Sequence, residues 1–205
     1  MLLFILRPPG KDETIDVSLS ERKALHEISD PQKMGKANRG MSLEEDINQS
    51  IIHYRNTERA IIHKKPTPVQ IVNVDYPKRS RAKITEAYFR QASTTDYNGV
   101  YKGRYVDFEA KETHQVQSFP LKNLHEHQIT HMQEIDAHGG FGFLILRFAR
   151  SQETFVIKTS DFLHLKASTE RKSVQKTHIE TYGVKLANTT LPPVDFLPAV
   201  DLLFQ

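Results

Sequence analysis

Apolar residues recur every three or four positions between residues 42 and 56, which predicts an amphipathic helix. Ser42 and Glu45 have the spacing of a capping box, so we expect the helix to start at Ser42 and to end near Asn56. Its buried face would consist of Leu43, Ile47, Ile51 and Tyr54.

Alternating or continuous apolar runs further along the chain predict strands at 60–65, 69–74, 94–101, 104–112, 141–149 and 153–158. The run at 141–149 is apolar almost throughout, which indicates a strand buried on both faces. We expect helices at 119–140, 159–166 and 171–183, and a terminal apolar segment at 195–204 that docks on the body. Together these elements predict a mixed α/β fold, with a mixed central β-sheet flanked by helices.

Two segments differ from this body. Residues 11–38 are polar without sustained periodicity, and we expect residues 1–38 to form a flexible N-terminal arm before a domain at 39–205. Residues 64–90 contain three prolines, seven Lys or Arg against two acids, and interleaved aromatic residues. The prolines forbid a continuous helix, so this segment is expected to form an extended, basic, protruding stalk.

Composition narrows the function classes. The chain has 205 residues, enough for one domain with an appendage, and a formal net charge of +3 that mildly favours an anionic partner. It has no cysteine, which excludes disulfides and cysteine-ligated zinc and favours a reducing cytoplasm. The apolar run at its start is too short to span a bilayer and lacks the features of a secretory signal.

The hairpin at 94–113 carries the candidate chemistry. Strand alternation puts Asp107, Glu109 and Lys111, together with Tyr105, on one face, and the partner strand brings Asp96 opposite Glu109. Two converging carboxylates form an oxygen site suited to Mg²⁺, and a nearby lysine can stabilise charge that develops on a phosphate. The competing interpretation is an ordinary solvated hairpin with cross-strand ion pairs.

The strings "KKPTPVQIV", "YPKRS", "TEAYFRQASTTDYNGVYKG" and "YVDFEAKET" resemble the RecU family of Holliday junction resolvases, from about residue 38 to the C-terminus. The resemblance implies a restriction-endonuclease-like core, Mg²⁺-dependent symmetric cleavage of four-way DNA junctions, and a homodimer whose stalk enters the junction. It implies a metal site of Thr94, Asp96, Glu109 and Gln128, with Lys111 stabilising the transition state. Glu45 is a weaker candidate for an accessory acid, and Asp107 is expected to support Lys111 or the turn.

Further predictions concern DNA contacts and protein partners. The residues expected to contact DNA phosphates are Arg39, Lys64, Lys65, Lys78, Arg79 and Arg81. A recombinase or branch-migration helicase is a candidate protein partner. His125, His127 and His131 are interpreted as helix histidines rather than a zinc site, because the HExxH pattern is absent. Two alternatives stay open: a duplex endonuclease of the same fold, and a DNA-bridging recombination accessory that does not cut.

Overall fold

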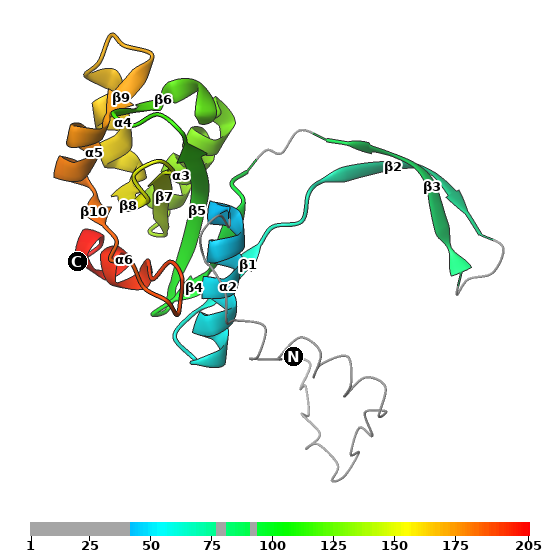
Figure 1. Cartoon of the computed structure of the whole chain (residues 1–205). Helices are drawn as coiled ribbons and strands as arrows, with labels where there is room; N and C mark the ends of the chain where they lie inside the picture. The colour runs from blue at the N-terminus through cyan, green and yellow to red at the C-terminus, as the bar shows by residue number, and fades with distance from the viewer. Residues whose placement is uncertain (1–41, 77–80, 91–93) are drawn as a thin grey trace, which may run out of the picture. The chain divides into compact units, whose positions relative to one another are not determined.

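A computed structural model describes residues 42–76, 81–90 and 94–205, and Figure 1 traces their course. Within these residues a six-stranded sheet has the order β1-β4-β5-β7-β8-β10. Strands β5 and β7 run parallel and all other neighbours are antiparallel, so the sheet is mixed, as predicted. The strands span Ile61–Lys64 (β1), Tyr97–Tyr101 (β4), Arg104–Thr113 (β5), Phe141–Phe148 (β7), Glu153–Lys158 (β8) and Val184–Lys185 (β10).

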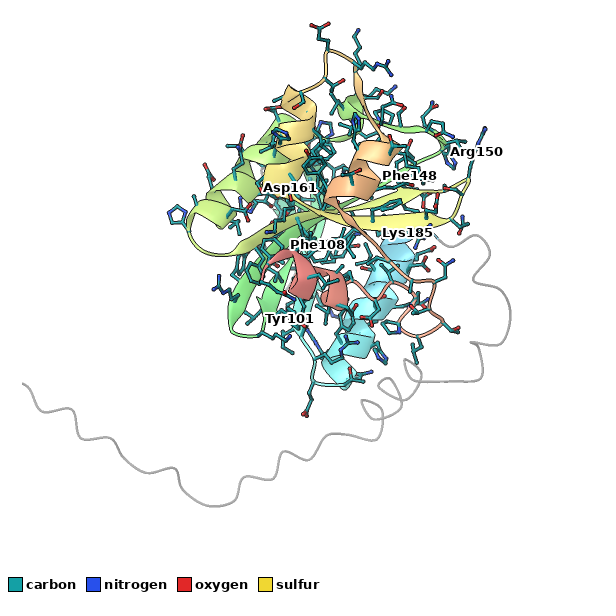
Figure 2. The ribbon with its side chains drawn as sticks, turned by 90° about the vertical axis from the view of Figure 1, so that its left-hand side faces the viewer. Tyr101, Phe108, Phe148, Arg150, Asp161 and Lys185 are labelled. Carbon is teal, nitrogen blue, oxygen red and sulfur yellow. The ribbon has the colours of Figure 1, made fainter. Side chains whose placement is uncertain are left out.

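Helices cover both faces of this sheet (Figures 1 and 2). Helices α2 (Leu43–Asn56) and α6 (Leu197–Leu203) pack on one face, and α3 (Glu126–Ala137), α4 (Thr159–Ala167) and α5 (Lys176–Tyr182) on the other. Along β7, Phe143 and Ile145 join the first core while Leu144 and Leu146 join the second. This double burial is why the strand is apolar almost throughout. The ring centroids of Phe108 on β5 and Phe196, just before α6, lie 5.1 Å apart.

Local sequence signals account for two element boundaries. Ser42 caps α2: its hydroxyl accepts from the Glu45 N–H, and the Glu45 carboxylate accepts from the Ser42 N–H at 2.9 Å. The predicted capping box is therefore confirmed, as is the helix end at Asn56. The β4–β5 turn has φ of 49° at Lys102 and 75° at Gly103, the left-handed pair typical of a two-residue hairpin turn.

The helix expected at 119–140 begins later than predicted. Residues Ser118–Pro120 form strand β6, which pairs with β9 (Ser173–Gln175), and Leu121–Asn123 form a short 3₁₀ turn, η3. Helix α3 starts only at Glu126, after an extended His125. Phe119 of β6 is completely buried in the core on the α3 side of the sheet, so tertiary packing overrode the apolar spacing. The segment at 171–183 was likewise only partly helical, because β9 precedes α5.

Residues of the predicted stalk form a second, two-stranded sheet. Strand β2 (Val69–Asp75) pairs antiparallel with β3 (Lys83–Phe89), and residues 77–80 between them lie outside the described residues. None of the described hairpin residues belongs to either core, and most of their side chains are exposed. The strand predicted at 69–74 is therefore confirmed as β2. The arm predicted at 1–38 also lies outside the described residues.

No helix in the described part of the chain is long and apolar enough to cross a membrane.

Candidate active site

One face of β5 is polar although it is buried. Asp107 and Glu109 have fully buried side chains, and Lys111 is 22% exposed. Val106 and Phe108 point the other way into the core beneath α2 and α6. The alternation predicted from the sequence is therefore present, and it places the acids on the side of the sheet that faces α3.

The chain just before β4 brings Asp96 to Glu109. Tyr97 pairs with Phe108 in the β4–β5 ladder, so Asp96 reaches the level of Glu109. The Asp96 N–H donates to Oε2 of Glu109 at 3.1 Å, and Nζ of Lys111 lies 2.6 Å from Oε1 of the same carboxylate. The structure thus gathers Asp96, Glu109 and Lys111, the three residues on which the predicted chemistry depends.

Burial dominates the electrostatics of Glu109. Desolvation, together with a hydrogen bond to the Asp96 side chain, raises the pKa of Glu109 to about 8, while Lys111 pulls it down. Oε1 of Glu109 is buried, and the Lys111 ammonium lies 2.6 Å from it. A buried carboxylate beside a second acid has the chemistry of a cation ligand.

The other two proposed ligands have different surroundings. Gln128 on α3 is buried, and its side-chain oxygen accepts from the His125 N–H at 3.1 Å as part of the helix cap. Thr94 donates its hydroxyl to the carbonyl of Thr95. The described residues contain no group of three or more His, Cys, Asp or Glu side chains placed to hold a metal. A metal here would therefore depend on Asp96 and Glu109 for its carboxylates.

A hollow of about 340 Å³ opens beside Asp96. Glu44 of α2 lines it, whereas the sequence had favoured Glu45, which the capping box occupies. Glu44 also forms an ion pair with Lys64. The acid of α2 that lines this hollow is therefore one position before the candidate Glu45, whose carboxylate the capping box engages. The full lining is Glu44, Lys64, Lys65, Pro66, Thr67, Pro68, Thr94, Thr95 and Asp96.

Asp107 has partners that the sequence did not indicate. Its carboxylate pairs with Lys65 at 2.8 Å, accepts from Thr95 and from Tyr105, and lies 3.3 Å from Nε2 of His131. We had expected it to support Lys111 or the turn; its ion pair is with Lys65 instead. No signal local to the strand could have identified this contact, because 42 positions separate Lys65 from Asp107.

The remaining candidates are the histidines near α3 and the basic residues predicted to contact DNA. His125 and His127 stack on each other with ring centroids 5.5 Å apart, whereas His131 contacts Asp107. Arg81 is exposed near the start of β3. Arg39, Lys78 and Arg79 lie outside the described residues.

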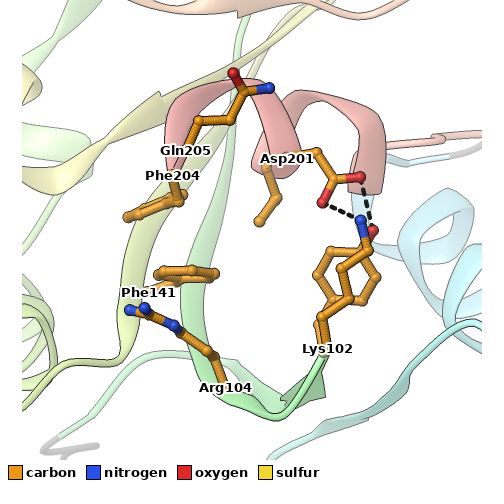
Figure 3. Close-up of a pocket in the computed structure, with 8 residues that line it drawn as sticks. Lys102, Arg104, Phe141, Asp201, Phe204 and Gln205 are labelled. Atoms are coloured by element: carbon orange, nitrogen blue, oxygen red, sulfur yellow. Dashed lines mark hydrogen bonds and ion pairs between the residues drawn. The ribbon is translucent and has the colours of Figure 1, made fainter.

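A second hollow, of about 430 Å³, lies beside the β4–β5 turn and α6 (Figure 3). Phe141 stacks on Phe204 with centroids 4.2 Å apart, Arg104 covers Phe141, and Lys102 pairs with Asp201 at 2.7 Å. None of its lining residues belongs to the carboxylate cluster, so we assign it no part in the site.

The mixed six-stranded sheet flanked by helices, with Asp96 just before β4 and Glu109 and Lys111 on β5, is consistent with the restriction-endonuclease-like class of fold. Residues 38–202 match the family model of RecU, Recombination protein U, and the chain belongs to this family.

Its relatives include proteins named Holliday junction resolvase RecU. The Geobacillus kaustophilus protein is 54% identical over 171 residues, covering 82% of this chain and 86% of its own. The Shouchella clausii protein is 52% identical over 81% of both chains. The Lactococcus lactis subsp. lactis protein is 47% identical over 97% of both, so similarity reaches into the first 37 residues, which we had expected to lie outside it.

Proposed function

We propose that this protein is a divalent-metal-dependent endonuclease that resolves four-way DNA junctions. The observation that carries the proposal is the buried Glu109 carboxylate, held between the Asp96 N–H and the Lys111 ammonium. Membership of the RecU family, whose relatives above are named as Holliday junction resolvases, supports the choice of substrate.

The metal would be held by the carboxylates of Asp96 and Glu109, with Thr94 and Gln128 completing the site. We propose Mg²⁺, because the donors are all oxygen atoms and cysteine is absent. Such an ion would lower the pKa of a bound water and polarise a phosphate oxygen. The raised pKa of Glu109 supports this assignment, because a nearby cation would stabilise its charged form.

The side chains would divide the remaining work of hydrolysis. Lys111 would orient the attacking water and stabilise negative charge that develops on the phosphate. Water adds to phosphorus as the bond to the 3′ oxygen breaks and that oxygen takes a proton. The products are a 5′-phosphate and a 3′-hydroxyl. Strand β5 fixes Glu109 relative to Lys111, and the hydrogen bond from the Asp96 N–H to Glu109 holds Asp96 beside them.

The β2–β3 hairpin is proposed as the stalk that engages the junction. Its exposed large apolar side chains include Ile71, Tyr88 and Phe89, the last 84% exposed, and such a surface favours contact with a partner. We propose that Lys64 and Arg81, with Arg39, Lys78 and Arg79, contact phosphates. A homodimer would supply two active sites for two opposed strands, and we place the enzyme in the cytoplasm. A recombinase or branch-migration helicase remains a proposed partner.

Nicking assays on a synthetic four-way junction and on linear duplex, each with and without Mg²⁺, test the proposal. We expect metal-dependent, paired nicks in the junction. Asp96→Asn and Glu109→Gln should abolish cleavage while junction binding persists, because affinity comes from basic residues elsewhere. Glu112→Gln, on the same strand but outside the site, is the matched control.

Each alternative function has its own outcome in these assays. Equal cutting of junction and duplex would favour a duplex endonuclease. Tight junction binding by the wild type without metal-dependent cutting would favour a DNA-bridging accessory. Undiminished cleavage by Asp96→Asn or Glu109→Gln would refute the assignment of these acids to the metal.

A further inference from the structure

The start of the hairpin is fastened to the segment that carries Asp96. Strand β1 ends at Lys64, and the chain then continues through Lys65 into the hairpin (Figure 1). The Lys65 N–H donates to the carbonyl of Asp96 at 2.7 Å, and its ammonium donates to the Thr95 hydroxyl at 3.0 Å. One lysine therefore holds two consecutive residues of the metal-binding segment, through its main chain and through its side chain.

Asp107 anchors this arrangement from within the sheet. Its carboxylate is fully buried, accepts from the Thr95 hydroxyl, and pairs with the Lys65 ammonium at 2.8 Å. Tyr105 of β5 donates to this carboxylate at 3.0 Å, and Nε2 of His131 on α3 lies 3.3 Å from it. A buried polar network with every acceptor engaged is rigid, because each member loses its partner if another moves.

We propose that Lys65, Thr95 and Asp107 form a positioning network that sets Asp96 against Glu109 and links the hairpin to the cleavage site. The inference rests on the proposed nuclease function. Asp96 precedes β4 and has no ladder partner within the strands to fix it. Its placement depends on the hydrogen bonds of its own main chain and on those of the residue before it. If bound DNA displaces the hairpin, the contacts of Lys65 would transmit that displacement to Asp96.

The neighbouring lysine has a contrasting environment. Lys64 pairs with Glu44, and both side chains are substantially exposed, at 40% and 58%. Such a pair exchanges readily with water or phosphate. Lys65 is 18% exposed and its partner is fully buried, so releasing it would leave an unpaired charge inside the protein. Lys65 thus acts on the site from within, while Lys64 remains available to DNA.

Thr95 offers the sharpest test, because Thr95→Val removes the hydroxyl with little change of shape and Thr95→Ser keeps it. We expect Thr95→Val to lower the single-turnover cleavage rate of the junction by about tenfold or more, since a misplacement of about 1 Å can cost about 100-fold. It should also weaken Mn²⁺ binding to the DNA-free protein, followed by electron paramagnetic resonance. Junction affinity in EDTA should stay within about twofold, because such affinity comes mainly from phosphate contacts. Thr95→Ser should restore both the rate and Mn²⁺ affinity.

Lysine variants separate positioning from DNA contact. Lys65→Met should reproduce the Thr95→Val pattern of slower cleavage and weaker Mn²⁺ binding. Lys64→Met should instead weaken junction binding and reduce its salt dependence by about one unit of slope. If Lys65→Met fails to fold, the double variant Lys65→Met/Asp107→Asn removes both charges together and is expected to keep the defect.

Three results would overturn the inference: wild-type rate and Mn²⁺ affinity in Thr95→Val, an equal defect in Thr95→Ser, or a Lys65→Met variant altered only in junction affinity. Failure of the proposed function is distinguishable. Wild-type protein would then bind junctions without cutting them, and the Mn²⁺ titrations would still test the network.

Discussion

At the scale of single residues, Glu153 shows how two lysines can hold one carboxylate. It opens β8 and pairs with Lys176, at the start of α5, and with Lys185 of β10. These hydrogen bonds, first that of Lys176 and then that of Lys185, lower the pKa of Glu153 to about 2. The carboxylate therefore ties a helix and an edge strand to the turn end of β8.

This pKa shift predicts a specific pH dependence of stability. Because the folded pKa lies below the ordinary 4.5, the contribution is complete above 4.5 and is lost as the pH falls toward about 2. Urea unfolding should show Glu153→Gln less stable than wild type at neutral pH, with the difference shrinking across that interval. Glu180→Gln, which removes a longer 3.7 Å contact to the same Lys176, should run parallel to wild type. A Glu153→Gln deficit that persists unchanged near pH 2 would contradict the assignment.

Residue by residue, the sequence was informative where geometry is local. Strand alternation and a two-residue turn were enough to predict that Asp96, Glu109 and Lys111 meet. The pairing of Lys65 with Asp107 was not predictable, because the intervening chain leaves the main sheet and returns before β4. Glu44 was overlooked for a different reason: adjacent helix positions differ by about 100° in direction, and only packing decides which one faces the site.

At the scale of elements, α2 is held on the sheet by more than its apolar face. Asp46 pairs with Arg147 of β7 at 2.6 Å, and both residues are buried. Arg147 also donates to Thr154 of β8 at 3.2 Å. This ion pair is the polar counterpart of the contacts that Ile47 and Tyr54 make in the same core.

Removing the acid of this pair should destabilise the fold strongly. Asp46→Ala leaves the Arg147 guanidinium buried without its carboxylate, which we expect to cost about 3–5 kcal/mol in the free energy of unfolding. Glu126→Ala breaks an exposed pair with Lys166 and should cost about 0–1 kcal/mol. Equilibrium urea denaturation of both variants measures the difference. Equal costs would mean that the buried pair contributes no more than a surface one.

Helices and strands were predicted best where the apolar residues of a segment followed a single periodicity throughout. Helix α2 combined a capping box with a clear apolar stripe, and its bounds followed from the sequence. The segment before α3 was misassigned because Leu121 and Leu124 share the spacing of a helix, while Phe119 is drawn into the β6–β9 pair. Three-residue strands carry too few positions for alternation to reveal them.

At the scale of the whole molecule, the described residues separate into a body with two cores and a hairpin that contributes to neither. The ends of the hairpin are already joined, because the Arg90 N–H donates to the carbonyl of Pro68 at 3.0 Å. Stability therefore belongs to the body, while the exposed apolar and basic side chains of the hairpin are available for binding.

This division predicts that the hairpin can be removed without loss of the catalytic centre. Residues 69–89 would be replaced by Asn-Gly, a two-residue turn that suits the Pro68–Arg90 pairing. We expect a thermal unfolding midpoint close to wild type, retained metal-dependent nicking of duplex at high enzyme concentration, and loss of the preference for four-way junctions. Competition between junction and duplex in one reaction measures that preference directly. An unchanged preference would assign junction recognition to the body, and a large fall in the unfolding midpoint would show that the hairpin supports the fold.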